Sequence, residues 1–202
     1  ERLGGNGNGD GNGSGSGHVR QAPPARVRQA PRAAAAPPDL LEQVARFYHQ
    51  TLAGSSVAKQ YLAGRGITNS DVVSALAIGY ADGSLLESAP EGSETRAALE
   101  ALGVITANGH ELMDDCVVVP LRDLAGNVVG LYGRPVARDG HFFLTGPRRG
   151  LVNAQCAATS EEIIITESVF DALSFLEAGI PNAVPIYGIH GWTPDHDALL
   201  AQ

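Results

Sequence analysis

A short run of three isoleucines, Ile163–Ile165, constrains the fold most, because a helical segment and a second apolar run come directly after it. A continuous β-branched run of this length is typical of a strand buried on both faces. The residues from Asp171 to Ala178 have the apolar spacing of a helix, and Ala183–Tyr187 predicts a second strand. Thr193-Pro194 then predicts the start of a last helix. This β-α-β-α order predicts a parallel sheet.

The residues before this segment have a different character. Apolar side chains at helical spacing predict four helices between residues 39 and 103, the first of them opened by a capping box of Asp39 and Glu42 and ended by Gly54. The other three are expected near residues 57–63, 70–77 and 94–102. The expected fold class is therefore α+β followed by α/β, with a small helical lead-in.

A mixed strand and hairpin region joins the two parts. Cys116–Pro120 and Val128–Tyr132 are compact apolar strand signals, and residues 123–127 between them have turn chemistry. They predict an antiparallel hairpin, and His141–Thr145 predicts a third strand.

Residues 1–38 are of low complexity, rich in Gly, Asn and Ser at first and then in Ala, Pro and Arg. Such a segment buries too little apolar surface to offset its ordering entropy, which predicts a disordered linker. The expected organisation is the linker, a core subdomain over 39–158 (helical to 103, strand and hairpin from 104) and a last domain over 159–202.

Composition limits the function classes. No apolar run approaches the roughly 18 residues that span a bilayer, and no secretion signal is visible, so the expected location is the cytoplasm, away from membranes. The two cysteines, Cys116 and Cys156, lack zinc-ligand spacing and are expected to be reduced and buried. The net charge of −8 argues against nucleic acid, but five arginines share one stretch: Arg122, Arg134, Arg138, Arg148 and Arg149.

Glu167 and Asp171 are the candidate chemical groups. Glu167 follows a predicted strand at its C-terminal end, where α/β sheets place their sites, and Asp171 falls in the first turn of the next helix. Two carboxylates there could hold Mg²⁺, or one could act as an acid or base. The alternative is a structural cap, because acids stabilise helix N-termini.

The order of these segments resembles a known family. The strand, Glu167, Asp171, the helix and a Gly188 loop are similar to the opening of a TOPRIM domain. Residues 58–67, 77–81 and 120–134, followed by Leu144–Pro147, are similar to the catalytic core of DnaG-type DNA primases. The resemblance runs from about residue 40 to the end, and it implies a chain cut before the family's Asp-x-Asp motif.

That resemblance implies a function. It implies a metal-dependent nucleotidyltransferase that synthesises short RNA primers on single-stranded DNA in replication, with nucleoside triphosphates as substrates and a replicative helicase as a further partner. Glu167 would be catalytic and, with Asp171, would bind Mg²⁺ or Mn²⁺; zinc is expected only in a preceding domain outside this chain. Arg134 would contact template or nucleotide, and Arg138, Arg148 and Arg149 match further basic positions less closely. The alternative for Arg134 is a surface salt bridge.

Several residues depart from the family pattern. Phe142 stands where the family has a lysine, Ser168 replaces a glycine, and Pro185 lies inside a predicted strand. Met113–Asp115 stands where the family has arginines. These departures favour a non-catalytic DNA-binding relic of a mobile element. A TOPRIM nuclease or topoisomerase-like protein is a further alternative.

Four C-terminal residues have the residue types or the spacing found at functional sites. Asp195 and Asp197 have the spacing of a metal motif, but they follow a Thr-Pro helix start and are expected to be first-turn helix acids. His190 and Trp192 lie in a glycine-flanked loop, where loop packing is expected rather than contact with a base.

Overall fold

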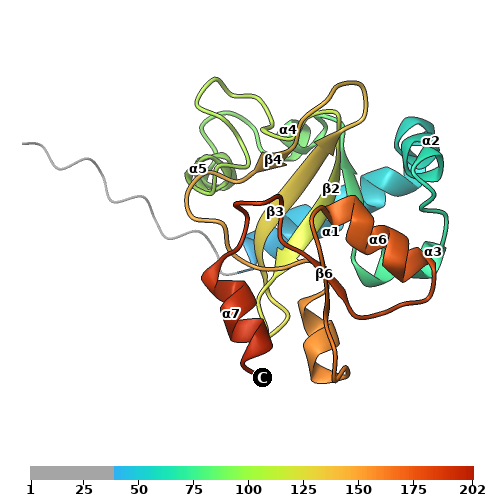
Figure 1. Ribbon diagram of the computed structural model, residues 1–202. Helices are drawn as coiled ribbons and strands as arrows, with labels where there is room; N and C mark the ends of the chain where they lie inside the picture. Colours follow the sequence, from blue (N-terminus) through green and yellow to red (C-terminus); the bar gives the residue numbers. More distant parts are fainter. Residues whose placement is uncertain (1–38) are drawn as a thin grey trace, which may run out of the picture. The chain divides into compact units, whose positions relative to one another are not determined.

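An antiparallel sheet of four strands forms the centre of the computed structural model, which describes residues 39–202 (Figure 1). The linker expected over residues 1–38 lies outside the described residues. The strands lie in the order in which they occur in the chain: β1 (Gly79–Ala81), β2 (Cys116–Arg122), β3 (Val128–Pro135) and β4 (Phe142–Phe143). No helix within residues 39–202 is both long and apolar enough to cross a bilayer.

Helices surround this sheet, and a second sheet comes after it in the chain. The helices before β2 are α1 (Leu40–Gly54), α2 (Ser56–Gly64), α3 (Ser70–Ala75), α4 (Leu85–Ser88) and α5 (Glu94–Ala101). After a 3₁₀ turn at Ala154–Ala158 come β5 (Ile164–Thr166), α6 (Val169–Glu177), β6 (Ala183–Pro185) and α7 (Pro194–Leu200). β5 and β6 pair in parallel, with Ile164 opposite Ala183.

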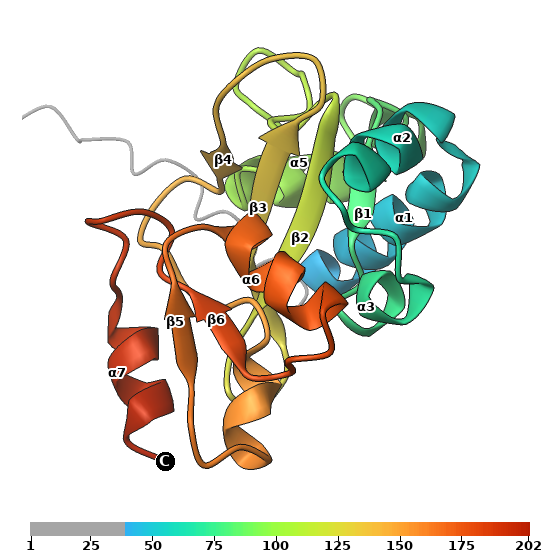
Figure 2. The ribbon, with the colours of Figure 1, turned by 45° about the vertical axis from the view of Figure 1, so that its right-hand side comes forward.

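The β2 strand is buried on both faces, and its alternation divides the core. Val117, Val119 and Leu121 join a cluster that includes residues of α2, α6 and β6. Cys116 and Val118 point to the other face and join residues of α1 and α5. Figure 2 shows the same arrangement, with β5, β6 and α6 on one side of β2 and β3, and α1 on the other.

The helix α1 packs directly on β1. A Cβ atom on Gly79 would lie 2.5 Å from the carbonyl carbon of Tyr48, so only glycine allows this approach. The contact explains why residues 79–81 form a strand rather than extending the predicted helical lead-in: Gly79–Ala81 pairs antiparallel with Cys116–Val118. The purely helical interpretation of residues 39–103 was therefore wrong at this point, and the short helix α4 was not predicted.

Other expectations can be compared element by element. The hairpin of β2 and β3 and the third strand β4 are confirmed, and β5, α6, β6 and α7 follow in the predicted order with parallel pairing. The expectation that Ile163–Ile165 is buried on both faces was wrong, because Ile165 is 39% exposed. Pro185 is the last residue of β6, and the hydrogen bond to β5 at this point comes from the next amide, that of Ile186, which donates to the Thr166 carbonyl.

The capping box predicted at Asp39 does not form. The Asp39 side chain accepts a hydrogen bond from Gln43 Nε2 at 2.8 Å and makes no cap contact. Glu42 turns instead to β2, where its Oε2 lies 2.9 Å from Arg122 Nη1. Arg122, counted in sequence among the basic residues, is therefore neutralised by a contact that fixes α1 against the sheet.

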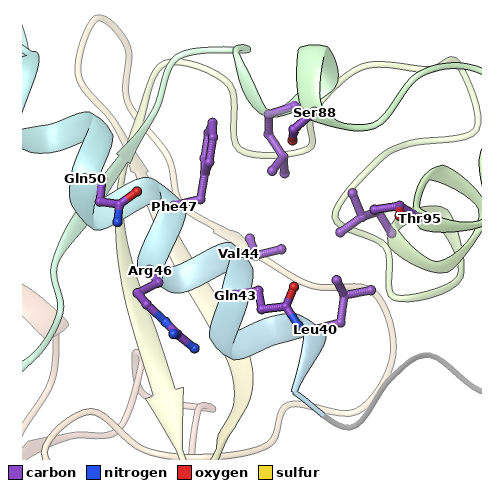
Figure 3. A pocket seen from close by; sticks show the side chains of 10 residues that line it. Leu40, Gln43, Val44, Arg46, Phe47, Gln50, Ser88 and Thr95 are labelled. Carbon is purple, nitrogen blue, oxygen red and sulfur yellow. The ribbon is translucent and has the colours of Figure 1, made fainter.

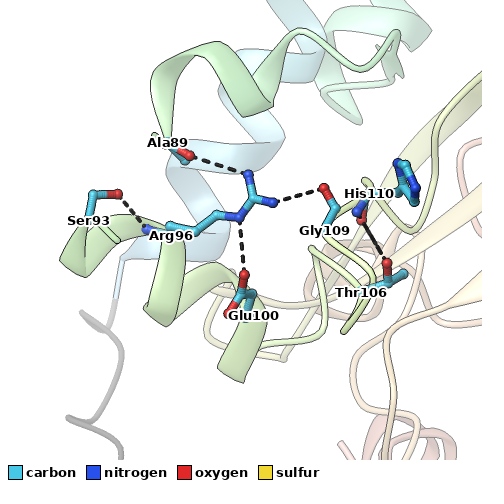
Figure 4. Close-up of polar contacts among 7 residues, drawn as sticks. All are labelled: Ala89, Ser93, Arg96, Glu100, Thr106, Gly109 and His110. Atoms are coloured by element: carbon cyan, nitrogen blue, oxygen red, sulfur yellow. Dashed lines mark hydrogen bonds and ion pairs between the residues drawn. The ribbon is translucent and has the colours of Figure 1, made fainter. Parts of the chain in front are cut away.

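A buried arginine holds α5 to the turn before β2. Arg96 is 8% exposed, and its guanidinium donates to the carbonyls of Gly109 (2.8 Å) and Ala89 (3.4 Å) and to Glu100 Oε1 (3.1 Å) (Figure 4). The guanidinium fork satisfies several acceptors at once, which an ammonium could not match in geometry.

One carboxylate joins two distant helices. Glu177, at the end of α6, accepts hydrogen bonds from the backbone amides of Thr68 (3.0 Å) and Asn69 (2.9 Å) and from the Thr68 hydroxyl (2.8 Å). These contacts lower the pKa of Glu177, with the Thr68 hydroxyl as the largest cause. The N-terminus of α3 is thereby anchored to α6.

Glu111 is a buried acid between α1 and α4. It is 4% exposed; its Oε2 accepts from the Tyr48 hydroxyl at 2.9 Å, and its Oε1 accepts from the Leu85 amide at 2.9 Å. Burial raises the pKa of Glu111 above 4.5, although the two donors oppose the shift.

A pH-dependent contribution of Glu111 to stability is expected. Because its folded pKa lies above the unfolded value, the stabilisation is complete below about pH 4.5 and is lost as the pH rises through the folded pKa. Relative to Glu111→Gln, which keeps an oxygen for Leu85, the free energy of unfolding of the wild type should fall between pH 4 and pH 7. Urea unfolding at several pH values measures this difference; a difference that does not change with pH would contradict the assignment.

Candidate nucleic-acid interface

A cleft of about 220 Å³ lies where β3 and β4 meet the C-terminal ends of β5 and β6. Tyr132 and Arg134 project from the same face of β3, and Phe143 is directly opposite Tyr132 on β4. The full lining is Tyr132, Arg134, His141, Phe143, Glu167, Ser168, Val169, Tyr187 and Gly188. The structure therefore brings together Arg134 and Glu167, which are far apart in the sequence.

Arg134 supplies the positive charge of the cleft. Its Nε is buried and has no hydrogen-bond partner in the described part of the chain. The carboxylate of Asp139 is fully exposed and lies 3.9 Å from Nη2. The surface salt bridge, which is the alternative role for Arg134, is therefore a long and weak contact. Burial lowers the pKa of Arg134, but the hydroxyls of Tyr61 and Tyr132 outweigh it and raise the pKa. The guanidinium stays charged and has unused donors.

Glu167 supplies the negative charge. Its side chain is exposed, and within residues 39–202 its carboxylate makes no hydrogen bond. Its backbone is fixed, because the Glu167 carbonyl accepts from the Gly188 amide at 2.8 Å and thereby extends the pairing of β5 with β6. Next to Gly188, Tyr187 has a φ of 62°, a left-handed conformation that is uncommon outside glycine. A free carboxylate on a held backbone is well placed to contact a ligand.

Asp171 has a different position. Its Oδ2 accepts from the hydroxyl of Ser168 at 2.8 Å and from the Ser168 amide at 3.1 Å, while the Ser168 Oγ accepts from the Asp171 amide at 3.2 Å. This reciprocal pair is a capping box at the start of α6. Asp171 does not line the cleft. Asp171 therefore makes the contacts of a structural cap at the helix N-terminus, which was the alternative to a metal ligand.

The metal-binding potential of the cleft rests on one carboxylate. Mg²⁺ prefers oxygen ligands and is often held by one or two carboxylates together with substrate phosphates. Glu167 fits that role, whereas one oxygen of Asp171 is already occupied by Ser168. Among residues 39–202, no group of three or more His, Cys, Asp or Glu side chains is arranged to hold a metal ion.

Of the other predicted basic residues, Arg148 contacts Phe143, which lines the cleft. The Arg148 guanidinium lies 4.4 Å above the ring of Phe143, and both Arg148 and Arg149 line an adjacent cleft of about 250 Å³. Arg138 lies elsewhere, because its guanidinium covers Phe142, which packs against the opposite face of the sheet.

Sequence reasoning missed a second arginine beside the cleft. Arg65, just after α2, lies over the rings of Tyr61 (5.3 Å) and Phe170 (5.4 Å). Tyr61 also packs edge-on against Phe170 of α6, and its buried hydroxyl has no partner in the described residues. Nothing in the sequence spacing places Arg65 near Phe170; only a predicted contact between α2 and α6 could have found it.

Comparison with known proteins decides the family. Residues 47–146 match the family model of the DNA primase catalytic core, N-terminal domain. The chain carries part of a DnaG-type primase catalytic core. It is 28% identical over 181 residues to the DNA primase of Escherichia coli K12, covering 80% of this chain and 31% of that primase. The chain thus spans about a third of the length of that relative.

Solved structures agree with this primase assignment. A structure of the DnaG catalytic core has a TM-score of 0.69 and 27% identity, covering 81% of this chain and 57% of that one. A DnaG primase catalytic domain bound to single-stranded DNA has a TM-score of 0.65 and 27% identity, covering 81% and 58%.

The two C-terminal aspartates that have the spacing of a metal motif make hydrogen bonds within the fold of this primase core. Asp195 and Asp197 lie in the first turn of α7, as predicted: Asp195 accepts from the Gly150 amide and Asp197 accepts from Trp192 Nε1 at 2.9 Å. Trp192 also stacks on the buried ring of His196. Both cysteines are free and buried, and burial raises the pKa of the Cys116 thiol to about 12.

A larger groove of about 360 Å³ lies between α1, α4 and α5, on the opposite side of the primase sheet. Figure 3 shows Val44 and Phe47 of α1 facing Ser88 and Thr95. The groove contains one cationic side chain, Arg46, and no carboxylate, so it lacks the paired charges of the Arg134 cleft.

Glu167, which lines the primase cleft, and Asp171, which does not, should differ in their effect on stability. Asp171→Ala removes the reciprocal half of the α6 capping box and an acid from the first turn, and should lower the free energy of unfolding by roughly 0.5–1 kcal/mol. Glu167→Gln removes no intramolecular contact and should change it by less than about 0.5 kcal/mol. Urea denaturation of both variants measures this, and equal losses would show that Asp171 does not act as a cap.

Proposed function

We propose that this chain forms the strand-binding cleft and supplies one metal ligand of a DNA primase that synthesises short RNA primers on single-stranded DNA. The observation that carries this proposal is the presence of both Arg134 and Glu167 in the lining of one cleft. The similarity to a primase domain whose structure holds single-stranded DNA supports that partner. Nucleoside triphosphates and a replicative helicase are proposed as the further partners of the whole enzyme.

The cleft would bind the sugar-phosphate backbone of a strand or the phosphates of a nucleotide. Arg134 lines the cleft, and guanidinium geometry matches phosphate oxygens in a bidentate manner. Arg65 and Arg148 extend the positive charge on either side, both held over aromatic rings. Arg149 is proposed as a weaker contact on the neighbouring cleft, and Arg138 as a residue outside this surface.

Glu167 is proposed as the catalytic carboxylate and ligand of Mg²⁺ or Mn²⁺. A bound ion would neutralise the charge of the phosphates and align them for in-line transfer. Glu167 would orient that ion from its fixed backbone, and Arg134 would hold the phosphate on the other side of the cleft. Asp171 would contribute through α6, by capping it, and not as a close ligand. Zinc remains a proposal only for a domain outside this chain.

The domain organisation is proposed with the function. Residues 39–158 would form the N-terminal core subdomain, and residues 159–202 the first part of a TOPRIM domain. The parallel pairing of β5 with β6, and the position of Glu167 at the end of β5, support that assignment.

A second candidate is a DNA-binding module without catalysis. The capping role of Asp171 favours it, as does the lack, among the described residues, of a three-ligand metal cluster. It shares the strand-binding cleft with the first proposal and differs only in the role of Glu167, so metal binding separates the two.

Strand binding should depend on Arg134. Arg134→Ala should weaken binding of a fluorescent oligothymidylate about tenfold at low salt and reduce the slope of affinity against salt by about one, because one phosphate contact is lost. Arg138→Ala removes the same charge on the other face of the sheet and should change the affinity by about twofold at most. Fluorescence anisotropy measures both, and equal losses would contradict the specific role of Arg134.

Metal binding should depend on Glu167. Added Mn²⁺ should selectively broaden the NMR signals of the amides around Glu167 and Gly188, and Glu167→Gln should abolish this effect. Glu161→Gln, an exposed acid before β5, is the matched control and should leave the broadening unchanged. Broadening that persists in Glu167→Gln would favour the module without catalysis.

A further inference from the structure

One wall of the Arg134 cleft is a stack of aromatic rings that the roles of Arg134 and Glu167 leave unexplained. The rings of His141 and Tyr132 lie 6.2 Å apart with an angle of 23°, an offset stack. Phe143 packs edge-on against both rings, at 5.6 Å from His141 and 5.4 Å from Tyr132, and Tyr187 continues the row at 5.4 Å from Phe143. The wall therefore joins β3, β4 and the loop after β6.

The two stacked rings differ in exposure. Tyr132 is 5% exposed and lies beneath, whereas His141 is exposed and lies outermost. One face of the imidazole is covered by Tyr132, and the ring lines the cleft. In the described part of the chain, the ring nitrogens of His141 take part in no hydrogen bond, although the rings of His49 and His196 each do. His141 is thus held by its contacts with the rings of Tyr132 and Phe143, and it is exposed to solvent.

The shape and charge of the cleft fit a single planar group next to a phosphate. Its volume of about 220 Å³ is below the range of about 300–1,000 Å³ typical of sites for drug-sized ligands, so one base fits better than a whole cofactor. Arg134 provides the cation for the phosphate, and Val169 and Gly188 add apolar surface to the lining. Aromatic platforms beside cationic side chains are the usual means of binding unpaired bases without sequence preference.

We propose that a nucleobase stacks on the exposed face of His141, with its phosphate at Arg134. The proposal rests on the function proposed above, since it names how the same cleft holds its nucleic acid. It gives a role to Phe143, which packs edge-on against both rings of the platform. Salt screens the stacking of a base on a ring less than it screens a contact between charges.

The test compares oligonucleotides that have the same charge and differ in their bases. Fluorescence anisotropy would measure the affinity of the whole chain for an oligothymidylate and for an abasic oligomer of equal length. The wild type should prefer the oligothymidylate by roughly tenfold or more, the range expected for stacking of a base. His141→Ala should remove most of that preference and leave abasic binding unchanged, and His141→Phe should restore it.

Controls separate this inference from folding and from the proposed function. His190→Ala removes an exposed histidine outside the cleft and should keep the full preference. Thermal unfolding should be the same for His141→Ala and the wild type, because the side chain is exposed. Equal binding of both oligomers by the wild type, or an equal loss for both in His141→Ala, would overturn the stacking proposal and leave strand binding intact. Failure of every oligomer to bind would refute the strand-binding function itself.

Competition identifies the source of the base. If ATP displaces the oligothymidylate from the wild type and does so less effectively from His141→Ala, the platform holds the base of an incoming nucleotide. If ATP competes equally with both, the platform holds a base of the strand. Both outcomes support a stacked base, and the salt dependence of the preference should be smaller than that of abasic binding.

Discussion

The burial of both faces of β2 is the constraint on which the rest of the structure depends. Val117 and Val119 face α6 and β6, and Cys116 and Val118 face α1, so one short strand belongs to both parts of the core. A polar residue on either face would leave a buried group without a partner. The strand also sets the register of β3, with Val117 opposite Arg134 and Val119 opposite Tyr132. The apolar packing of β2 therefore sets the positions of Arg134 and Tyr132 in the cleft.

The elements that could be predicted from the sequence are those defined by local chemistry. The hairpin of β2 and β3 is marked by turn residues between two apolar runs, and α7 is marked by Thr193-Pro194. The strand β1 was missed because its pairing with β2 and its close contact with α1 are both long-range. The capping box predicted at Asp39 does not form, and Glu42 instead contacts Arg122, which is distant in the sequence. A capping box that was not predicted forms at Ser168 and Asp171.

The same distinction applies to the site. Glu167 was identified by its position at the end of a predicted strand and Arg134 by resemblance, and the fold places them in one cleft, which no spacing rule would have shown. Five arginines that look like one basic stretch in the sequence have different surroundings in space. Arg122 is paired with Glu42, Arg138 lies on the opposite face of the sheet, and Arg134 and Arg148 remain near the cleft. Arg65, which the stretch does not include, lies beside them.

The contact of Glu177 with the start of α3 has a mechanical consequence. At one end of α6, Phe170 supports Arg65, and at the other end Glu177 holds the backbone of Thr68 and Asn69. The segment from residue 65 to residue 69 is thus attached to α6 at both of its ends. Rotation of this segment away from α6 would break the hydrogen bonds to Glu177 and separate Arg65 from the ring of Phe170. An incoming strand would therefore meet an arginine whose position is set before it arrives, and little of the binding energy would be spent on ordering that side of the cleft.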